Sequence, residues 1–258
     1  MIEISPAQLP SLSDWFPPGI PGATTLAEHA SATGNGRWWA DRATRPRVVA
    51  VSCADQVLLA GDPRALAPGD LAGFASHHAQ ATRRFLPMLG HAFDQVVPRE
   101  RMVYVHRYPG TAPRLPRGVT VRRLLPDDVT QIHALSPDAG WLHATWGGPA
   151  GLAASGQARG AFHKGHLLAV ACTYLRGDRY EDIAIFTTPE HRRRGLARAC
   201  VAALCIDITT RGRTPSWSCS RENRASRLLA WTSGFRLERE YVHYLTGQPA
   251  HRTTRIPA

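Results

Sequence analysis

Lysine is almost absent from this sequence of 258 residues, because Lys164 is the only one. Arginine therefore supplies nearly all of the 31 basic side chains, which outnumber the 20 acidic ones and give a formal net charge of +11. A genome rich in arginine codons explains arginine in place of lysine, but it does not explain the excess of basic over acidic residues. A positive field of this kind favours acidic partners, such as phosphates, nucleic acid or an acidic protein.

Cysteine is also scarce, and long apolar runs are missing. The five cysteines include no pair separated by two residues, so neither a disulfide framework nor a zinc site is predicted, and the spacing of the histidines indicates no other metal site. No apolar run approaches the length of a membrane span. The first residues lack a basic segment followed by an apolar core, so we expect no signal peptide and a reduced, cytoplasmic protein.

A proline-rich segment divides the sequence near its middle. Residues 108–118 hold three prolines and two glycines, a composition typical of a linker. We place a domain boundary there, with one domain over residues 1–113 and a second over residues 114–258. The elements expected in the first domain are a helix over 25–39, a hairpin of strands 47–53 and 56–60, and a helix over 71–85 with Asp70 as its N-cap. A further helical piece around 89–97 and a strand over 101–107 follow them.

The second half alternates between strand and helix patterns. Helical spacing is found after Pro126, from Leu196 and from Asn223. The element order β-α-α-β-β-β-α-β-α-β predicts an α/β fold of the α+β kind, with a mixed sheet and helices on its faces. Strands are expected near residues 119–124, 158–163, 166–175, 183–188, 215–220 and 234–244.

The stretch over residues 180–211 organises this half. Alternating residues over 183–188 predict a buried strand, which Pro189 ends because proline has no amide hydrogen. Apolar residues then recur every three or four positions from Leu196, the period of one helical face. Unpaired helix amides and positive charge meet in the turn between strand and helix, and together they favour a bound anion. The turn reads Arg192-Arg193-Arg194-Gly195-Leu196-Ala197.

Three segments of this half together resemble the GNAT superfamily of N-acyltransferases. They are residues 121–128, 187–197 and 223–235, and the second fits the acyl-CoA signature of that family, Arg or Gln, two residues, Gly, one residue, then Gly or Ala. The resemblance covers about residues 118–247 and implies a C-terminal GNAT fold. The N-terminal half is similar to the smaller, degenerate GNAT-like domain of two-lobed members, but it lacks the signature turn, so we expect no cofactor there.

The resemblance implies a donor that carries phosphopantetheine, namely acetyl-CoA, another acyl-CoA or an acyl carrier protein. Its pyrophosphate would lie on the amides of the turn, and its pantetheine would add to the open edge of the preceding strand like a further strand. Asn223 matches a family position that often contacts the cofactor, and it is equally suited to be the N-cap of the next helix. The donor-binding residues expected in this way are Phe186, Thr187, Arg192, Arg193, Arg194, Gly195, Leu196, Ala197, Arg198 and Asn223.

Amide formation needs a base that removes a proton from the amine and a group that stabilises the collapsing intermediate. Glu181 stands where several family members place the base, and Asp182 is its neighbour on the opposite strand face. Both residues could instead be an exposed pair at the start of the strand. Where the family usually has a tyrosine as general acid, this chain has Ala230. The thiolate could therefore leave without a proton donor, or the general acid could be a water molecule, Ser226, Tyr241 or Tyr244.

The sequence therefore predicts an enzyme, a GNAT-type N-acyltransferase that moves an acyl group from a phosphopantetheine thioester to the amine of a small molecule. The two-lobed form resembles actinobacterial enzymes of antibiotic biosynthesis and self-resistance, and a basic rim would steer an acidic acyl carrier protein. Two alternatives stay open. One is a transferase that uses aminoacyl-tRNA, which the net charge allows, and the other is a non-catalytic acyl-CoA-binding regulatory module. No metal is expected, and no oligomeric state is predicted.

Overall fold

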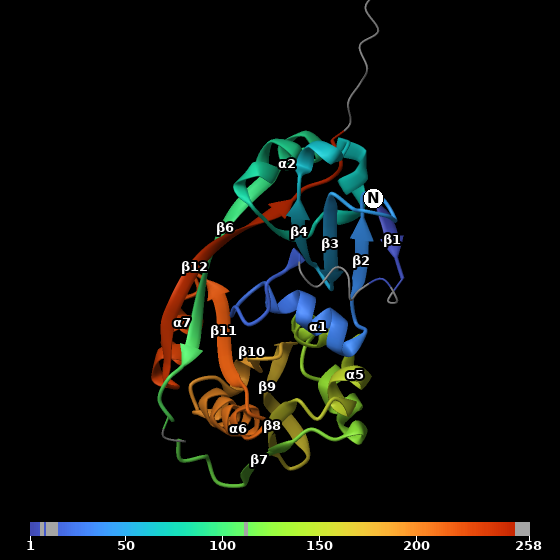
Figure 1. The fold of residues 1–258 in the computed structure, drawn as a ribbon. Coiled ribbons are helices and arrows are strands. Elements are labelled where there is room, and N and C mark those ends of the chain that lie inside the picture. Colours follow the sequence, from blue (N-terminus) through green and yellow to red (C-terminus); the bar gives the residue numbers. More distant parts are fainter. Residues whose placement is uncertain (6–7, 9–14, 111–112, 251–258) are drawn as a thin grey trace, which may run out of the picture. The chain divides into compact units, whose positions relative to one another are not determined.

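The computed structural model describes residues 1–5, 8, 15–110 and 113–250, and the chain forms two compact units (Figure 1). The domain boundary predicted between residues 113 and 114 lies within the second unit, and a division of the chain at that point stays a prediction. No helix in the described residues is long and apolar enough to cross a membrane. The first unit comprises Met1–Phe16, Arg37–Glu100 and Val242–Ala258, and the second comprises Pro17–Gly36 and Arg101–Tyr241.

The first unit is built on a mixed sheet. Across this sheet the strand order is β1 (Ile2–Ile4), β2 (Arg37–Ala40), β3 (Val48–Cys53), β4 (Gln56–Gly61), β5 (His78–Ala81) and the end of β12 (Phe235–Thr246). The strands β4 and β5 are parallel, while the other pairs are antiparallel. The helix α2 (Leu86–Ala92) packs with them around a core that includes Val48, Leu59 and Phe85.

The sequence predicted the hairpin of this unit but missed the neighbouring strand, β5. The hairpin is confirmed as β3 and β4, which pair from Val48 with Gly61 to Cys53 with Gln56. The helix predicted over 71–85 is wrong, because this segment contains the end of a short 3-10 helix, the strand β5 and a second 3-10 turn. Parallel pairing of β5 with β4 draws the segment into the sheet, and Phe74 and Phe85 are still buried in the core.

The second unit is also built on a mixed sheet, as predicted. Its strands lie in the order β12-β6-β11-β10-β9-β8-β7, and β10 and β11 form the parallel pair. Each strand predicted from residue 119 onward is present within a few residues of its expected bounds. The bounds are β6 (Val96–His106), β7 (Val119–Arg123), β8 (Ala158–His163), β9 (His166–Arg176), β10 (Tyr180–Thr187) and β11 (Thr214–Ser220).

Helices cover both faces of this second sheet (Figure 1). The two helices α6 (Leu196–Thr210) and α7 (Arg224–Thr232) share a core with Ile183 and Trp217 on one face. Ala184 and Val170 belong to the core of the other face, because side chains alternate along a strand. The helices of that other face are α1 (Thr25–Thr33), α3 (Val129–His133), α4 (Trp141–Ala144) and α5 (Pro149–Ala154).

Helix α1 is shorter than the sequence predicts. It ends at Gly34, whose left-handed backbone has φ of +71°, and residues 37–40 form a strand of the first unit, so the predicted helix over 25–39 is wrong beyond residue 33. His29 holds α1 against the second sheet. Its Nε2 donates to the carbonyl of Thr145 (2.8 Å) and its Nδ1 accepts the amide hydrogen of Arg176 (3.0 Å). The contact with Arg176 requires the neutral ring, because a protonated Nδ1 cannot accept a hydrogen bond, and burial lowers the pKa of His29.

Stability is therefore expected to depend on pH through His29. The imidazole of the unfolded chain binds a proton near pH 6.5, whereas that of the folded chain does so only at lower pH. The free energy of unfolding therefore falls as the pH drops below about 6.5, by at most about 1.4 kcal/mol per pH unit. His29→Gln, which cannot be protonated, should flatten this dependence in urea unfolding between about pH 7.5 and pH 5. His166→Gln, at an exposed position, is the matched control. Identical pH dependence in wild type and His29→Gln would contradict the assignment.

Candidate functional site

Strands β10 and β11 begin side by side and then diverge. They pair in parallel where Tyr180–Asp182 meets Thr214–Ser216. Beyond this point β10 pairs with β9 as far as Thr187, and β11 pairs with β6 as far as Ser220. Within the described residues, the edge of β10 that faces β11 has no strand partner over residues 183–187. Its backbone groups form an open edge to which an extended chain can add.

The chain turns sharply from β10 into α6. Arg193 and Gly195 both have left-handed backbones, with φ of +62° and +78°. A Cβ at position 195 would also lie 3.3 Å from Pro113, so this place in the turn suits only glycine. Gly195 is the N-cap of α6 and offers no side chain to the first amides of the helix, so these remain available to an anion. The side chains of residues 192–194 are exposed beside them.

The open edge and the turn belong to one continuous segment. Thr187 ends β10, and its buried hydroxyl has no hydrogen-bond partner among the described residues. The Nε of Arg192 donates to the carbonyl of Thr187 (3.4 Å). A buried hydroxyl without a partner marks a place where a ligand can bind. The structure thus gathers the predicted residues Phe186, Thr187, Arg192, Arg193, Arg194, Gly195, Leu196, Ala197 and Arg198 at this one edge, and their contacts with a donor stay predictions.

The third predicted segment begins with Asn223, which caps α7. Its Oδ1 accepts the amide hydrogen of Ser226 (3.0 Å), so of the two roles open to it the N-cap is present. The Ser226 hydroxyl accepts a hydrogen bond from the indole of Trp217 (2.9 Å). Trp217 packs in the core between the sheet and helices α6 and α7, and the fully buried Ala230 of α7 belongs to the same core. Ser226 therefore lies on the opposite side of the sheet from Asp182, and the structure does not bring these two predicted catalytic residues together.

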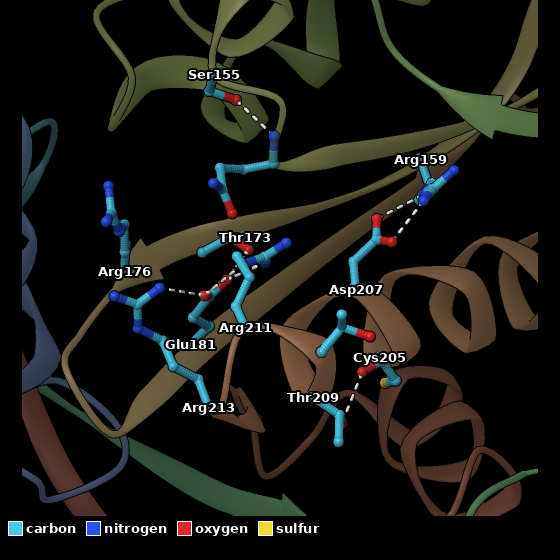
Figure 2. Close-up of polar contacts among 12 residues, drawn as sticks. Ser155, Arg159, Thr173, Arg176, Glu181, Cys205, Asp207, Thr209, Arg211 and Arg213 are labelled. Carbon is cyan, nitrogen blue, oxygen red and sulfur yellow. Dashed lines mark hydrogen bonds and ion pairs between the residues drawn. The ribbon is translucent and has the colours of Figure 1, made fainter.

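Glu181 is held in a buried ion pair (Figure 2). The carboxylate has no exposed surface and accepts hydrogen bonds from the Thr173 hydroxyl (2.6 Å) and from the Nε (3.1 Å) and Nη2 (2.7 Å) of Arg211. Arg213 contributes a further contact at 3.3 Å. Both carboxylate oxygens thus have charged partners at the end of α6. Glu181 is positioned to stabilise the fold, and an amine has no free oxygen of this carboxylate to approach.

Asp182, on the other face of β10, has a different environment. Its Oδ1 accepts hydrogen bonds from the hydroxyls of Ser216 and Ser218, each at 3.1 Å. It lies at the last residue of the parallel pairing, where β10 and β11 diverge. Burial raises the pKa of Asp182 to about 6, and the two serine hydroxyls and the charge of Arg101 limit the rise. A carboxylate that titrates near pH 6 is suited to accept a proton at neutral pH.

Sequence reasoning missed Ser216, Ser218 and Arg101. Arg101 lies on β6, and its Nη2 donates to the carbonyl of Ser218 (3.3 Å). The one available signal was the alternation of serines at 216, 218 and 220, which puts three hydroxyls on one face of a strand. Nothing in the sequence pairs that face with Asp182, because parallel pairing joins residues more than thirty positions apart.

Together these features define what the site can bind. An extended, amide-containing chain fits along the open edge of β10, an anionic group fits on the amides of the turn, and a carboxylate stands where the two strands diverge. The part of the chain that the structure describes contains no group of three or more His, Cys, Asp or Glu residues that could hold a metal ion.

Comparison with known sequences identifies relatives over most of the chain. The family model for GNAT acetyltransferases matches residues 21–244. An uncharacterized N-acetyltransferase from the mutA 5′ region of Streptomyces virginiae is 58% identical over 212 residues, which are 82% of this chain and 90% of that protein. The uncharacterized N-acetyltransferase YdfB of Bacillus subtilis is 28% identical over 138 residues, 52% of this chain and 51% of that protein.

Solved structures share the fold. A GCN5-related N-acetyltransferase-like protein from Streptococcus suis superposes with a TM-score of 0.72 at 19% identity, covering 93% of this chain and 98% of that one. A tandem GNAT protein from the clavulanic acid biosynthesis pathway superposes with a TM-score of 0.60 at 11% identity, covering 94% of this chain and 96% of that one. Both comparisons extend over nearly the whole length of each chain.

Proposed function

The chain belongs to the GNAT acetyltransferase family and is an N-acyltransferase, and from this premise we propose that it moves an acyl group from acyl-CoA to the amine of a small molecule. The observation that carries the proposal is the divergence of β10 and β11 next to the Gly195 turn. A pantetheine arm would add to the open edge at residues 183–187, and its pyrophosphate would meet the first amides of α6.

Asp182 is the base in this proposal. The thioester at the inner end of the pantetheine arm would lie where the strands diverge, and Asp182 is located there. At neutral pH the carboxylate is mostly ionised, since its pKa is about 6, and it can take the proton that the amine loses as the amide bond forms. The hydroxyls of Ser216 and Ser218 hold the carboxylate in place and stabilise its charge.

An acyl carrier protein is a second donor of the same chemistry, because it carries the same phosphopantetheine arm. Parallel strands place their carboxyl ends at one edge of a sheet, so the turn after β10 and the loop after β11 lie at the same edge. That edge displays the exposed arginines 192, 193, 194, 221 and 224, which would attract an acidic partner.

A role in antibiotic biosynthesis or self-resistance is proposed by analogy with the tandem GNAT protein of clavulanic acid biosynthesis. A cytoplasmic location is also proposed, in keeping with five buried cysteines that form no disulfide in the described residues.

The first unit is proposed to be a degenerate GNAT-like lobe. Its antiparallel hairpin β3-β4 is followed by a parallel partner, β5, just as the hairpin β9-β10 is followed by β11 in the second unit. The connection between β4 and β5 contains only short 3-10 helices, at Pro63–Ala65 and Pro68–Phe74, where the second unit has the long helix α6. Because no long helix follows its turn, we place the donor in the second unit and propose that the first lobe binds none.

The proposal is tested by native mass spectrometry of the purified protein, followed by turnover of acetyl-CoA with a panel of small amines. Bound CoA or acyl-CoA together with amide product is the expected result. Absence of CoA binding combined with tRNA binding that weakens steeply with salt would replace the proposal by an aminoacyl-tRNA-dependent transferase. Tight CoA binding without turnover of any amine would instead indicate a regulatory acyl-CoA-binding module.

Gly195→Ala is expected to weaken CoA binding by about tenfold or more. An alanine at φ of +78° is strained by about 1–2 kcal/mol, and its Cβ presses on Pro113, so the turn must move away from the position that presents its amides. Gly212→Ala is the matched control, because that glycine also has a left-handed backbone (φ +75°) but has nothing within 4 Å of an added Cβ. Isothermal titration with CoA checks the prediction, and equal affinities for the two variants would contradict it.

A further inference from the structure

Four strands of the second unit bring a chain of polar side chains to the face of the sheet that carries Asp182. Ser218 on β11 donates to Asp182 on β10 (3.1 Å), and the guanidinium of Arg101 on β6 donates to the Ser218 carbonyl (3.3 Å). Arg101 also forms a hydrogen bond with the hydroxyl of Tyr241 on β12. These contacts connect the proposed base to a phenol through Ser218 and Arg101.

The Tyr241 ring is packed rather than free in solvent. Gly22, from the segment that precedes α1, lies so close that a Cβ at that position would be 3.7 Å from Cε1 of Tyr241 and 2.9 Å from Cγ2 of Val103. The backbone of Gly22 has φ of +103°, a conformation in which side chains are strained. A glycine at this position lets the chain approach the tyrosine closely, and the close approach keeps the hydroxyl in a defined place beside Arg101.

We propose that Tyr241 is the proton donor to the leaving thiolate in the acyl transfer, an inference that rests on the proposed function. The amine nitrogen attacks the thioester carbon, and the new C–N bond forms as the C–S bond breaks. The proton lost by the amine goes to Asp182, and the departing sulfur takes the phenolic proton of Tyr241. A proton then returns through solvent from Asp182 to the phenolate, which restores both groups and leaves one amide and one thiol.

The electrostatics of the cluster agree with these two roles. Burial is the main cause that raises the pKa of Tyr241 above its usual value, so the hydroxyl keeps its proton at neutral pH. The charged groups that face it are Arg101, Asp182 and Arg239. Asp182 ionises near pH 6. Two groups on one face thus hold opposite protonation states at neutral pH, the pattern expected of an acid and a base, and Arg101 would stabilise the phenolate as it forms.

The other candidate donors lie elsewhere. Tyr244, three residues further along β12, belongs to the first unit, where it packs against the core and pairs with Ala79. Tyr104 faces α6 and α7, and its hydroxyl donates to the sulfur of Met102 (3.5 Å). Ser226 is on that same face and is bound to Trp217. Of the tyrosines on β12, Tyr241 is the one whose hydroxyl interacts with Arg101, the same arginine that acts on Asp182.

The test compares Tyr241→Phe with Tyr244→Phe in steady-state kinetics with acetyl-CoA and the best amine. Tyr241→Phe keeps the ring that packs on Gly22, and it should lower kcat by about a hundredfold with both KM values changed less than threefold. Tyr244→Phe should retain wild-type kcat. A kcat for Tyr241→Phe within a factor of two of wild type would overturn the inference, and so would a loss expressed only in KM or in thermal stability.

A second measurement separates proton donation from packing. Site-specific replacement of Tyr241 by a fluorinated tyrosine, whose hydroxyl ionises at lower pH, should make kcat fall on the alkaline side at a pH where the wild-type rate is still level. An unchanged alkaline profile would exclude proton donation. If the wild-type protein itself transfers no acyl group, the proposed function fails and the inference fails with it, and this outcome is distinct from a wild-type enzyme that does not need the Tyr241 hydroxyl.

Discussion

Replacing Asp182 by asparagine is expected to remove acyl transfer and to stabilise the protein at the same time. Asparagine has nearly the same shape and keeps an oxygen that accepts from Ser216 and Ser218, but it cannot take a proton. Loss of a general base costs about 10²- to 10⁴-fold in rate. Steady-state kinetics at saturating acetyl-CoA measures this loss, which should appear in kcat and not in donor binding.

The gain in stability follows from the raised pKa of Asp182. A carboxyl whose folded pKa of about 6 exceeds its ordinary value of 3.8 destabilises the fold once it is ionised, and the full effect of about 3 kcal/mol is present above pH 6. Asp182→Asn removes this cost, so its free energy of unfolding at about pH 7.5 should exceed that of wild type. The difference should shrink as the pH falls through 6 toward 4, where the wild-type carboxyl is neutral in the folded state and only partly ionised in the unfolded state.

Urea unfolding at the two pH values checks the stability, and the assay checks the rate. An Asp182→Asn variant that retains wild-type kcat would show that this carboxylate is not the base. A variant that is inactive and also less stable at both pH values would show that Asp182 serves the fold, because its ionised form would then be the stabilising one.

Glu181→Gln is expected to do the reverse, with a large loss of stability and little change in kcat. The substitution leaves Arg211 and Arg213 without their counter-charge, and breaking a buried pair in this way costs about 3 kcal/mol. Because neither oxygen of Glu181 is open to a substrate, the fraction that stays folded should turn over within about threefold of wild type. Thermal unfolding and kinetics at a temperature well below the transition give the two quantities.

The chain offers a matched control for this variant in the same unit. Asp207 on α6 pairs with Arg159 (Figure 2). It lies 3.8 Å from Arg123, and its side chain keeps some exposure. Asp207→Asn removes a carboxylate from an arginine pair without touching the face of the sheet near Asp182, and it should cost less than Glu181→Gln. A Glu181→Gln variant that is fully stable but inactive would assign the base to Glu181 in place of Asp182.

The local features of this site were predictable from the sequence. Strand, turn and helix over residues 180–211 are specified by short-range signals: an alternating run, a proline, a glycine, and apolar residues at helical spacing. The N-cap at Asn223 is equally local. The predicted helix over 71–85 failed because its segment gains more from pairing with β4 than from its own helical spacing, and that pairing is a tertiary contact.

The division of roles between Glu181 and Asp182 was not predictable from the sequence. The two acids are neighbours, and alternation shows only that they face opposite sides of the strand. What distinguishes them comes from distant segments: Arg211 and Arg213 on one side, and Ser216, Ser218 and Arg101 on the other. Only the register of the sheet brings these groups to the two carboxylates.

The central claim is that the donor site is formed by the divergence of β10 and β11 together with the turn at Gly195. A crystal structure of the protein in complex with CoA would test this claim most directly. The expected density places the pyrophosphate on the amides of residues 193–198 and the pantetheine arm along the open edge of residues 183–187, with the thiol toward Asp182. CoA bound at another surface, or a β10 edge left empty at saturating CoA, would contradict it.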